Sequence, residues 1–176
     1  KVITEAYFKN VRDEFKKIAP HKLYLGCRFA RSNSNAVAIG AKYCDVMSYN
    51  VYSHTLANFS LPDGLDKPVL IGEFHFGALD RGLFHPSLIK TGNQAERGQA
   101  YHDYVASALL HDNIIGTHWH QFADQATTGR FDGENFQVGL VDICDTPYPE
   151  TIDKVREIGY RLYETRYGQV DTEASP

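Results

Sequence analysis

The sequence is poor in several residue types that mark common protein classes. It holds one Trp, one Met and three Cys in 176 residues, and it has no apolar run long enough to cross a bilayer. An odd number of cysteines, irregularly spaced and without a CxxC pair, argues against a disulfide framework and against a zinc site, and indicates buried free thiols. We therefore expect neither insertion into a membrane nor a structure cross-linked by disulfides.

Other signals are missing as well. No cluster of Lys and Arg stands out, and the net charge is -4, which argues against nucleic acid as a partner. No GxGxxG or GxxxxGK[ST] follows an expected strand, which argues against nucleotide binding. No secretory signal is visible, and the chain opens inside a helical pattern, as expected for a piece of a longer polypeptide. What is present, 43% hydrophobic and 23% charged residues, is typical of a globular protein.

The spacing of apolar residues predicts alternating helices and strands. The expected strands cover 23–29, 45–52, 69–74 and 114–122; the expected helices cover 3–18 and 36–43, begin after Asn93 and near Pro149, and include one turn between 53 and 67. Strands that are apolar throughout and alternate with helices indicate a parallel sheet covered by helices. Such a sheet belongs either to a doubly wound domain or to part of a barrel.

Two of the helices carry further signals. The first should bury one stripe of apolar residues, formed by Ile3, Tyr7, Val11, Phe15 and Ile18. The third should begin with Asn93 as its capping residue, because Glu96 follows three positions later as in a capping box.

Polar or aromatic side chains end all four expected strands. In parallel α/β folds the functional site lies at the carboxyl ends of the strands. A purely structural sheet has no need of such side chains there. The residues in question are Arg28, Asn50, Tyr52, Glu73, His75, Trp119, Gln121 and Asp124.

Glu73 is the most informative of these residues. It follows the apolar run Val69-Leu-Ile-Gly72, so its strand is expected to be buried and its charge needs partners. An isolated Glu in that place is more often part of a structural ion pair. The neighbouring Arg28 and Tyr52, with the aromatic Trp119 further along the sheet, favour a functional carboxylate instead.

These strand ends resemble those of clan A glycoside hydrolases. Lys67-Pro-Val-Leu-Ile-Gly-Glu-Phe74 resembles their seventh barrel strand, which ends in the nucleophilic Glu, and Asn50-Val-Tyr52 resembles the sixth, whose Tyr hydrogen-bonds that Glu. Trp119 matches the eighth-strand Trp that forms the base of the sugar subsite in that clan. Gly72-Glu-Phe-His-Phe-Gly77, His118-Trp119 and Gly129-Arg-Phe-Asp-Gly-Glu-Asn135 are similar to glycoside hydrolase family 50, the β-agarases. The resemblance extends from about Leu23 to Tyr163.

The chain departs from the clan pattern in one respect. The clan places its acid/base Glu after an Asn at the end of strand four, and no Asn-Glu dipeptide ends a strand here. The resemblance therefore implies the C-terminal half, strands five to eight, of a (β/α)8 TIM barrel over residues 1–168. Such a fragment is expected to need the missing N-terminal half of the barrel or a second copy of itself, and to be inactive alone. The sequence after Gly168 predicts a disordered tail at 169–176.

The resemblance also implies a mechanism. A retaining enzyme needs two carboxyl groups roughly 5 Å apart. Glu73 would attack the anomeric carbon, while Tyr52 and Arg28 would keep it ionised, and the absent Glu would act as acid and base. Trp119 would stack on a galactose-type ring. The remaining expected binding residues are Asn50, His75, Gln121, Asp124, Asp132, Glu134 and Asn135. The implied substrate is agarose or a related galactan, and the implied location is secreted or in the cell envelope; no cofactor or metal is expected.

Rival interpretations stay open at this point. His118 and His120 form an HxH pair that a metallohydrolase would use, although strand alternation sets them opposite Trp119. Asp132-Gly-Glu-Asn135 has oxygen ligands for calcium but lacks EF-hand spacing, and is more simply a turn. The sequence also fits a β-galactosidase of a related clan A family, a non-catalytic carbohydrate-binding half-barrel, or a doubly wound domain that binds a phosphate or small metabolite.

Overall fold

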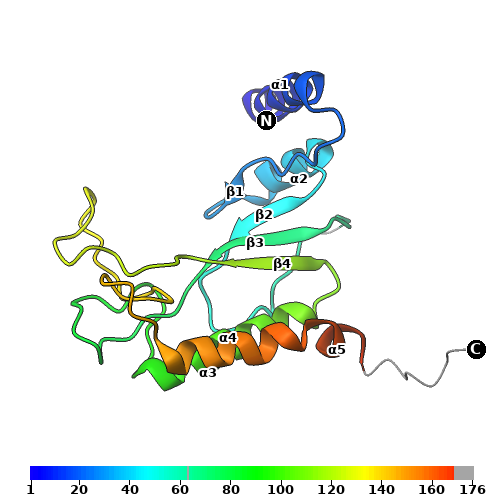
Figure 1. The fold of residues 1–176 in the computed structure, drawn as a ribbon. Helices are drawn as coiled ribbons and strands as arrows, with labels where there is room; N and C mark the ends of the chain where they lie inside the picture. Colours follow the sequence, from blue (N-terminus) through cyan, green and yellow to red (C-terminus); the bar gives the residue numbers. More distant parts are fainter. Residues whose placement is uncertain (63, 169–176) are drawn as a thin grey trace, which may run out of the picture. The chain divides into compact units, whose positions relative to one another are not determined.

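The computed structural model describes residues 1–62 and 64–168 as an α/β structure with a four-stranded sheet (Figure 1). The helices are α1 (Val2–Ile18), α2 (Ser34–Tyr43), α3 (Gln94–Leu109), α4 (Pro149–Tyr160) and α5 (Leu162–Tyr167). The strands are β1 (Arg28–Phe29), β2 (Met47–Asn50), β3 (Val69–Phe74) and β4 (Ile114–Trp119). In the part of the chain that is described, no helix is both long enough and apolar enough to span a membrane. The tail predicted at 169–176 lies outside the described residues.

The sheet has the order β1-β2-β3-β4, and β2 pairs in parallel with both β1 and β3. This confirms the parallel sheet expected from the alternation of helices and strands. The pairing of β2 with β3 is regular from Met47 to Tyr49 and then shifts, so that Asn50 lies opposite Glu73.

The chain folds into two compact units, each built from several stretches of sequence. The first contains Lys1–Val51, Asn58–Phe74 and Asn113–His118, and the second contains Tyr52–Ala57, His75–Asp112 and the chain from Trp119 onward. We call them the sheet unit and the helical unit, because the first holds nearly the whole sheet and the second holds α3, α4 and α5.

The core of the sheet unit includes β2 and β3, where Met47, Val69 and Ile71 are fully buried, and extends to the contact between α1 and α2. Phe8 of α1 is buried against Phe29 at a ring distance of 6.1 Å, and both rings lie close to where a side chain on Gly40 would stand. The prediction that one apolar stripe of α1 is buried was wrong. Ile3, Tyr7, Val11 and Ile18 are exposed and Phe8, outside the stripe, is the buried residue of this helix.

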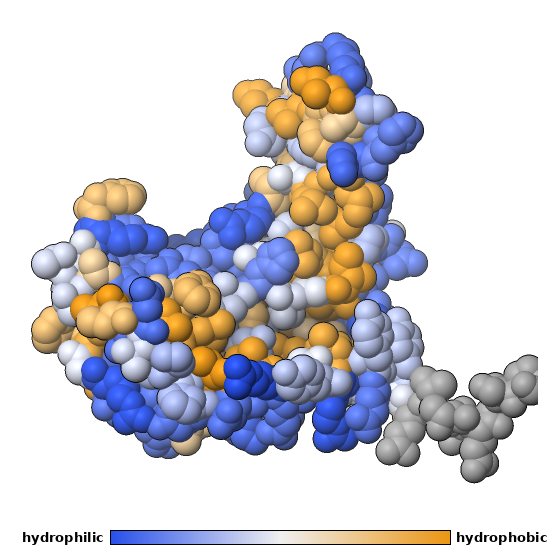
Figure 2. Space-filling view, in the orientation of Figure 1, coloured by the Kyte–Doolittle hydropathy of each residue, from blue (hydrophilic) through white to orange (hydrophobic). Residues whose placement is uncertain are grey.

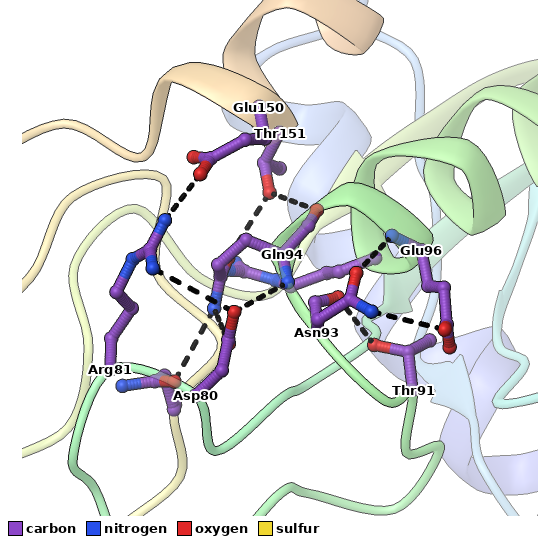
Figure 3. Close-up of polar contacts among 10 residues, drawn as sticks. Asp80, Arg81, Thr91, Asn93, Gln94, Glu96, Glu150 and Thr151 are labelled. Atoms are coloured by element: carbon purple, nitrogen blue, oxygen red, sulfur yellow. Dashed lines mark hydrogen bonds and ion pairs between the residues drawn. The ribbon is translucent and has the colours of Figure 1, made fainter.

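In the helical unit, α3 and α4 lie side by side (Figure 1). Gly98 makes this close approach possible, since a Cβ there would stand 2.7 Å from the Glu150 carbonyl oxygen. The predicted cap of α3 is confirmed: the Asn93 side chain accepts from the Glu96 amide at 2.9 Å. Figure 3 shows that Asp80 and Thr151 join Gln94 at the same helix end.

Three strands are shorter than predicted. In place of 23–29, 45–52 and 114–122, the structure has β1 at Arg28–Phe29, β2 at Met47–Asn50 and β4 at Ile114–Trp119. Before β1, the Tyr24 amide donates to the Asp45 carboxylate, and the Asp45 amide donates to the Tyr24 carbonyl oxygen. These two hydrogen bonds are not part of the β-sheet pairing. An apolar run identifies a segment that can form a β-strand. The segment is part of the sheet only where a neighbouring strand pairs with it in register.

Candidate active site

Glu73 ends β3 in an ion pair with Arg28. The distance from Arg28 Nη1 to Glu73 Oε1 is 2.6 Å, and only 16% of the Glu73 side chain is exposed, against 53% for Arg28. The Val51 amide donates to the Glu73 carbonyl oxygen at 3.0 Å, which ties the end of β3 to the chain leaving β2. The sheet unit therefore presents one shielded carboxylate in a fixed position at the end of a central strand.

Gly72 makes room for this ion pair. The Arg28 side chain crosses the main chain of β3 at Gly72, where Nη1 also donates to the Gly72 carbonyl oxygen at 3.3 Å. A Cβ at Gly72 would stand 2.5 Å from Arg28 Cδ and 2.9 Å from Ser48 Oγ. Any side chain at this position would therefore displace Arg28.

We expect Gly72→Ala to separate Arg28 from Glu73 and to destabilise the chain by about 1–3 kcal/mol, as overpacking of a filled space does. A crystal structure of the variant and its urea unfolding curve measure both effects. Gly159→Ala on α4 is the control, because nothing lies within 4 Å of its added Cβ. An unchanged Arg28–Glu73 ion pair in Gly72→Ala would contradict the expectation.

Asn50 lies opposite Glu73 in the register of the sheet and carries an acceptor without a donor. Among residues 1–62 and 64–168, nothing donates a hydrogen bond to its buried Oδ1. A buried carbonyl oxygen normally has a partner. The sheet unit thus holds three of the predicted site residues, Arg28, Asn50 and Glu73, at the ends of its neighbouring strands.

The other predicted residues belong to the helical unit. His75 is 2% exposed and its ring lies 4.6 Å from that of Tyr52. The Leu88 amide donates to His75 Nε2 at 3.3 Å, so Nδ1 carries the proton that bonds the His120 carbonyl oxygen at 3.1 Å. Both ring nitrogens are engaged, which describes a neutral histidine held by the main chain.

Trp119 is half-buried and its indole is fixed on several sides. Nε1 donates to the Val138 carbonyl oxygen at 2.9 Å, and the ring lies edge-on to Tyr101 at 5.3 Å and tilted to Phe76 at 6.3 Å. The Arg97 guanidinium lies 5.5 Å from the ring centre. The orientation of this side chain is therefore determined by the protein alone.

Arg97 is fully buried and was missed in the sequence. It donates to the carbonyl oxygens of Phe76, at 3.0 Å, and of Gly139, and to Gln94 Oε1 at 2.7 Å. Burial lowers the pKa of its guanidinium to about 10. A signal existed, because Arg97 lies four residues before Tyr101 on the face of α3 that carries the apolar residues.

Asp124 and Gln121 bond to their own unit. Asp124 is 7% exposed, accepts from the Gly139 amide at 2.6 Å and from the Tyr148 hydroxyl, and burial raises the pKa of its carboxyl. Gln121 Nε2 donates to the Ala123 carbonyl oxygen at 3.0 Å. These bonds give Asp124 a structural place beside Arg97, and its predicted role toward a sugar stays a prediction.

The segment 130–135 contains a turn, but the turn spans Arg130 to Gly133 instead of the predicted Asp132 to Asn135. Arg130 pairs with Asp132 at 2.6 Å and with Glu134 at 2.8 Å, and Glu134 also accepts from Gln125 at 2.9 Å. Asn135 is half-buried beside them. The HxH pair considered as metal ligands has His118 exposed and His120 half-buried. Within the described ranges, no group of three His, Cys, Asp or Glu side chains could hold a metal ion.

Comparison with known proteins adds a second kind of information. No family model matches the chain. It is 42% identical over 172 residues to β-agarase B of Vibrio sp. (strain JT0107), covering 94% of this chain and 18% of that protein. Among solved structures it matches an exo-β-agarase with a TM-score of 0.90 at 43% identity, covering 94% of this chain and 23% of that one. The agarase AgWH50C matches with a TM-score of 0.89 at 41% identity, over 93% and 24%. The chain thus spans about a fifth of the length of β-agarase B.

Proposed function

We propose, from the similarity of nearly the whole chain to β-agarases, that it forms part of a glycoside hydrolase that degrades agarose. The observation that carries the proposal is Glu73, a shielded carboxylate at the end of β3 that is held at 2.6 Å by Arg28. A glycosidase needs a carboxylate fixed in this way, at the strand ends where a parallel sheet presents its site.

We assign Glu73 the role of nucleophile in a retaining mechanism. Its carboxylate attacks the anomeric carbon, and a glycosyl ester forms as the glycosidic bond breaks. Arg28 fixes the carboxylate for this attack, and Asn50, which lies opposite Glu73 in the sheet, binds a sugar hydroxyl through the amide group of its side chain. In the same assignment, Tyr52 donates a hydrogen bond to the nucleophile, and Trp119 forms a platform for the sugar ring.

The second carboxyl group of the mechanism must come from elsewhere. No Asn-Glu dipeptide ends a strand in this sequence, and the chain covers 18% of β-agarase B. We propose that it supplies strands five to eight of a barrel, and that another segment or a second copy supplies the acid/base group. Because agarose is a polymer outside the cell, we also propose that the enzyme works in a secreted or envelope-bound form.

The test compares two substrates and two preparations. Hydrolysis of agarose and of an aryl β-galactoside is measured for this chain alone and for its mixture with a separately expressed N-terminal half of a β-agarase. We expect the mixture to hydrolyse agarose and the chain alone to be inactive. Hydrolysis by the chain alone would contradict the proposal that the chain lacks the acid/base carboxyl group. Hydrolysis of the aryl galactoside without agarose would favour a β-galactosidase.

A further inference from the structure

Phe131 stands fully in water at the tip of a closed turn. The exposed fraction of this residue is 101%, the highest of the large hydrophobic residues described. The Gly133 amide bonds the Arg130 carbonyl oxygen at 2.9 Å, which closes a β-turn with Phe131 at its second position. We call residues 129–134 the Phe131 loop. In Figure 2, apolar atoms rise above a hydrophilic base where Figure 1 draws this loop in yellow.

Ion pairs connect three side chains of the Phe131 loop. Arg130 reaches across it to both carboxylates, with Nε and Nη2 on Asp132 at 3.1 and 2.6 Å and Nη2 on Glu134 at 2.8 Å. Gly129 and Gly133 have positive φ angles of 83° and 87°, which glycine adopts without strain. Phe131 is therefore exposed on a turn that ion pairs and a main-chain hydrogen bond close.

A buried residue anchors the same loop to the helical unit. Gln125 is 3% exposed, donates to Glu134 Oε2 at 2.9 Å and accepts from the Phe136 amide at 2.9 Å. The loop is thus attached on its inner side while its tip faces solvent.

The fold itself does not explain a phenylalanine at this tip. The second position of such a turn accepts most residues and does not call for phenylalanine, and a phenyl ring in water forgoes the free energy of burial. Single exposed apolar residues are common on protein surfaces, and Phe131 is set apart by its full exposure on a turn closed by three ion-paired side chains. The cost to stability points to a ligand that covers the ring.

The surroundings of the ring favour a sugar over a protein. Arg130, Asp132 and Glu134 keep 38%, 35% and 32% of their side chains exposed around the turn. Charged residues are depleted at the cores of protein interfaces. An apolar ring beside carboxylates and a guanidinium instead suits a sugar, which has an apolar C–H face and hydroxyls at its rim.

We propose that Phe131 is an aromatic platform that stacks against a sugar residue of the agarose chain, while Asp132 and Glu134 accept from its hydroxyls. This inference rests on the proposed function and extends it from one sugar subsite to a second one. The platform adds affinity for oligosaccharides long enough to reach it and none for shorter ones.

The experiment measures binding of agarose oligosaccharides of increasing length to the 176-residue chain by isothermal titration calorimetry. We expect Phe131→Ala to weaken binding of the longer oligosaccharides about tenfold, as loss of one stacking contact does, and to leave the shortest unchanged. Phe131→Trp restores the affinity. Tyr160→Ala is the control, because Tyr160 is an aromatic residue that is 86% exposed on α4. All variants should keep the melting temperature of the natural chain.

Each other outcome decides against the platform. Equal affinities of Phe131→Ala and the natural chain at every length overturn it and leave the proposed function standing. No binding of any oligosaccharide by the natural chain overturns the platform, whereas the proposed function is tested separately by agarose hydrolysis in the mixture with an N-terminal half. Unchanged sugar affinity with weakened association of Phe131→Ala with an N-terminal half would show that the ring contacts protein.

Discussion

Replacing Glu73 by Gln is expected to lower agarose hydrolysis by the completed enzyme by about 10⁴-fold or more, as removal of a catalytic nucleophile does. An amide oxygen carries no negative charge and forms no stable ester with the anomeric carbon. The variant should still bind agarose oligosaccharides, because Gln keeps the size of Glu and can still accept from Arg28 at the place where the ion pair was. Initial rates on agarose measure the effect.

The control for this prediction is Glu157→Gln, the same substitution on the exposed face of α4, where 45% of the side chain is accessible. It should leave the rate unchanged. A second variant distinguishes the two carboxyl roles. Glu73→Ala supplied with azide should release a galactosyl azide of inverted configuration, because azide takes the place of the missing nucleophile. An azide product with retained configuration would show that Glu73 is the acid/base group instead.

Replacing Arg97 by Met is expected to destabilise the chain by about 3–5 kcal/mol, as breaking a buried charged network does. Met fills most of the volume, but the carbonyl oxygens of Phe76 and Gly139 lose their donor, and Gln94 Oε1 loses another. The Trp119 and Tyr148 rings also lose the cation that lies 5.5 and 5.3 Å from their centres. Chemical unfolding followed by far-UV circular dichroism measures the change.

Arg161→Met is the matched variant. Arg161 is 62% exposed and pairs with Glu164 three positions later, so its loss should change the free energy of unfolding by less than about 1 kcal/mol. Because Trp119 is the only tryptophan, its fluorescence also reports on Arg97 directly. An Arg97→Met chain as stable as the natural one, with the same emission spectrum, would show that the buried guanidinium holds nothing in place.

Much of the fold was predictable because its elements carry local signals. The run Val69 to Phe74 became β3 with the predicted bounds, since a short apolar stretch between Pro68 and a glycine-rich loop can form little else. The cap at Asn93 was equally local. The extent of β1 was not predictable, because only two of the seven residues predicted there find a partner in β2.

The site shows the same division between local and distant information. Because polar residues collect at strand ends, the sequence predicted that Arg28 and Glu73 lie close together, although 45 positions separate them. Arg97 escaped because a charged residue on a helix is normally solvated, and its burial depends on carbonyl groups from segments that are far away in the sequence. The full exposure of Phe131 was not predictable either, because the sequence indicated a turn at Asp132–Asn135, whereas the structure closes it from Arg130 to Gly133.

The order of the sheet, β1-β2-β3-β4, is also the order of synthesis. During translation each new strand leaves the ribosome next to a neighbour that has already been made, and no strand has to wait for a distant one or insert between two others. The partners Arg28 and Ser48 lie 20 positions apart and Ser48 and Leu70 lie 22 apart, so each pairing closes a long loop, and the entropy of loop closure is lost one strand at a time. The sheet can therefore grow strand by strand, at the pace of elongation, with one unpaired edge moving along the nascent chain.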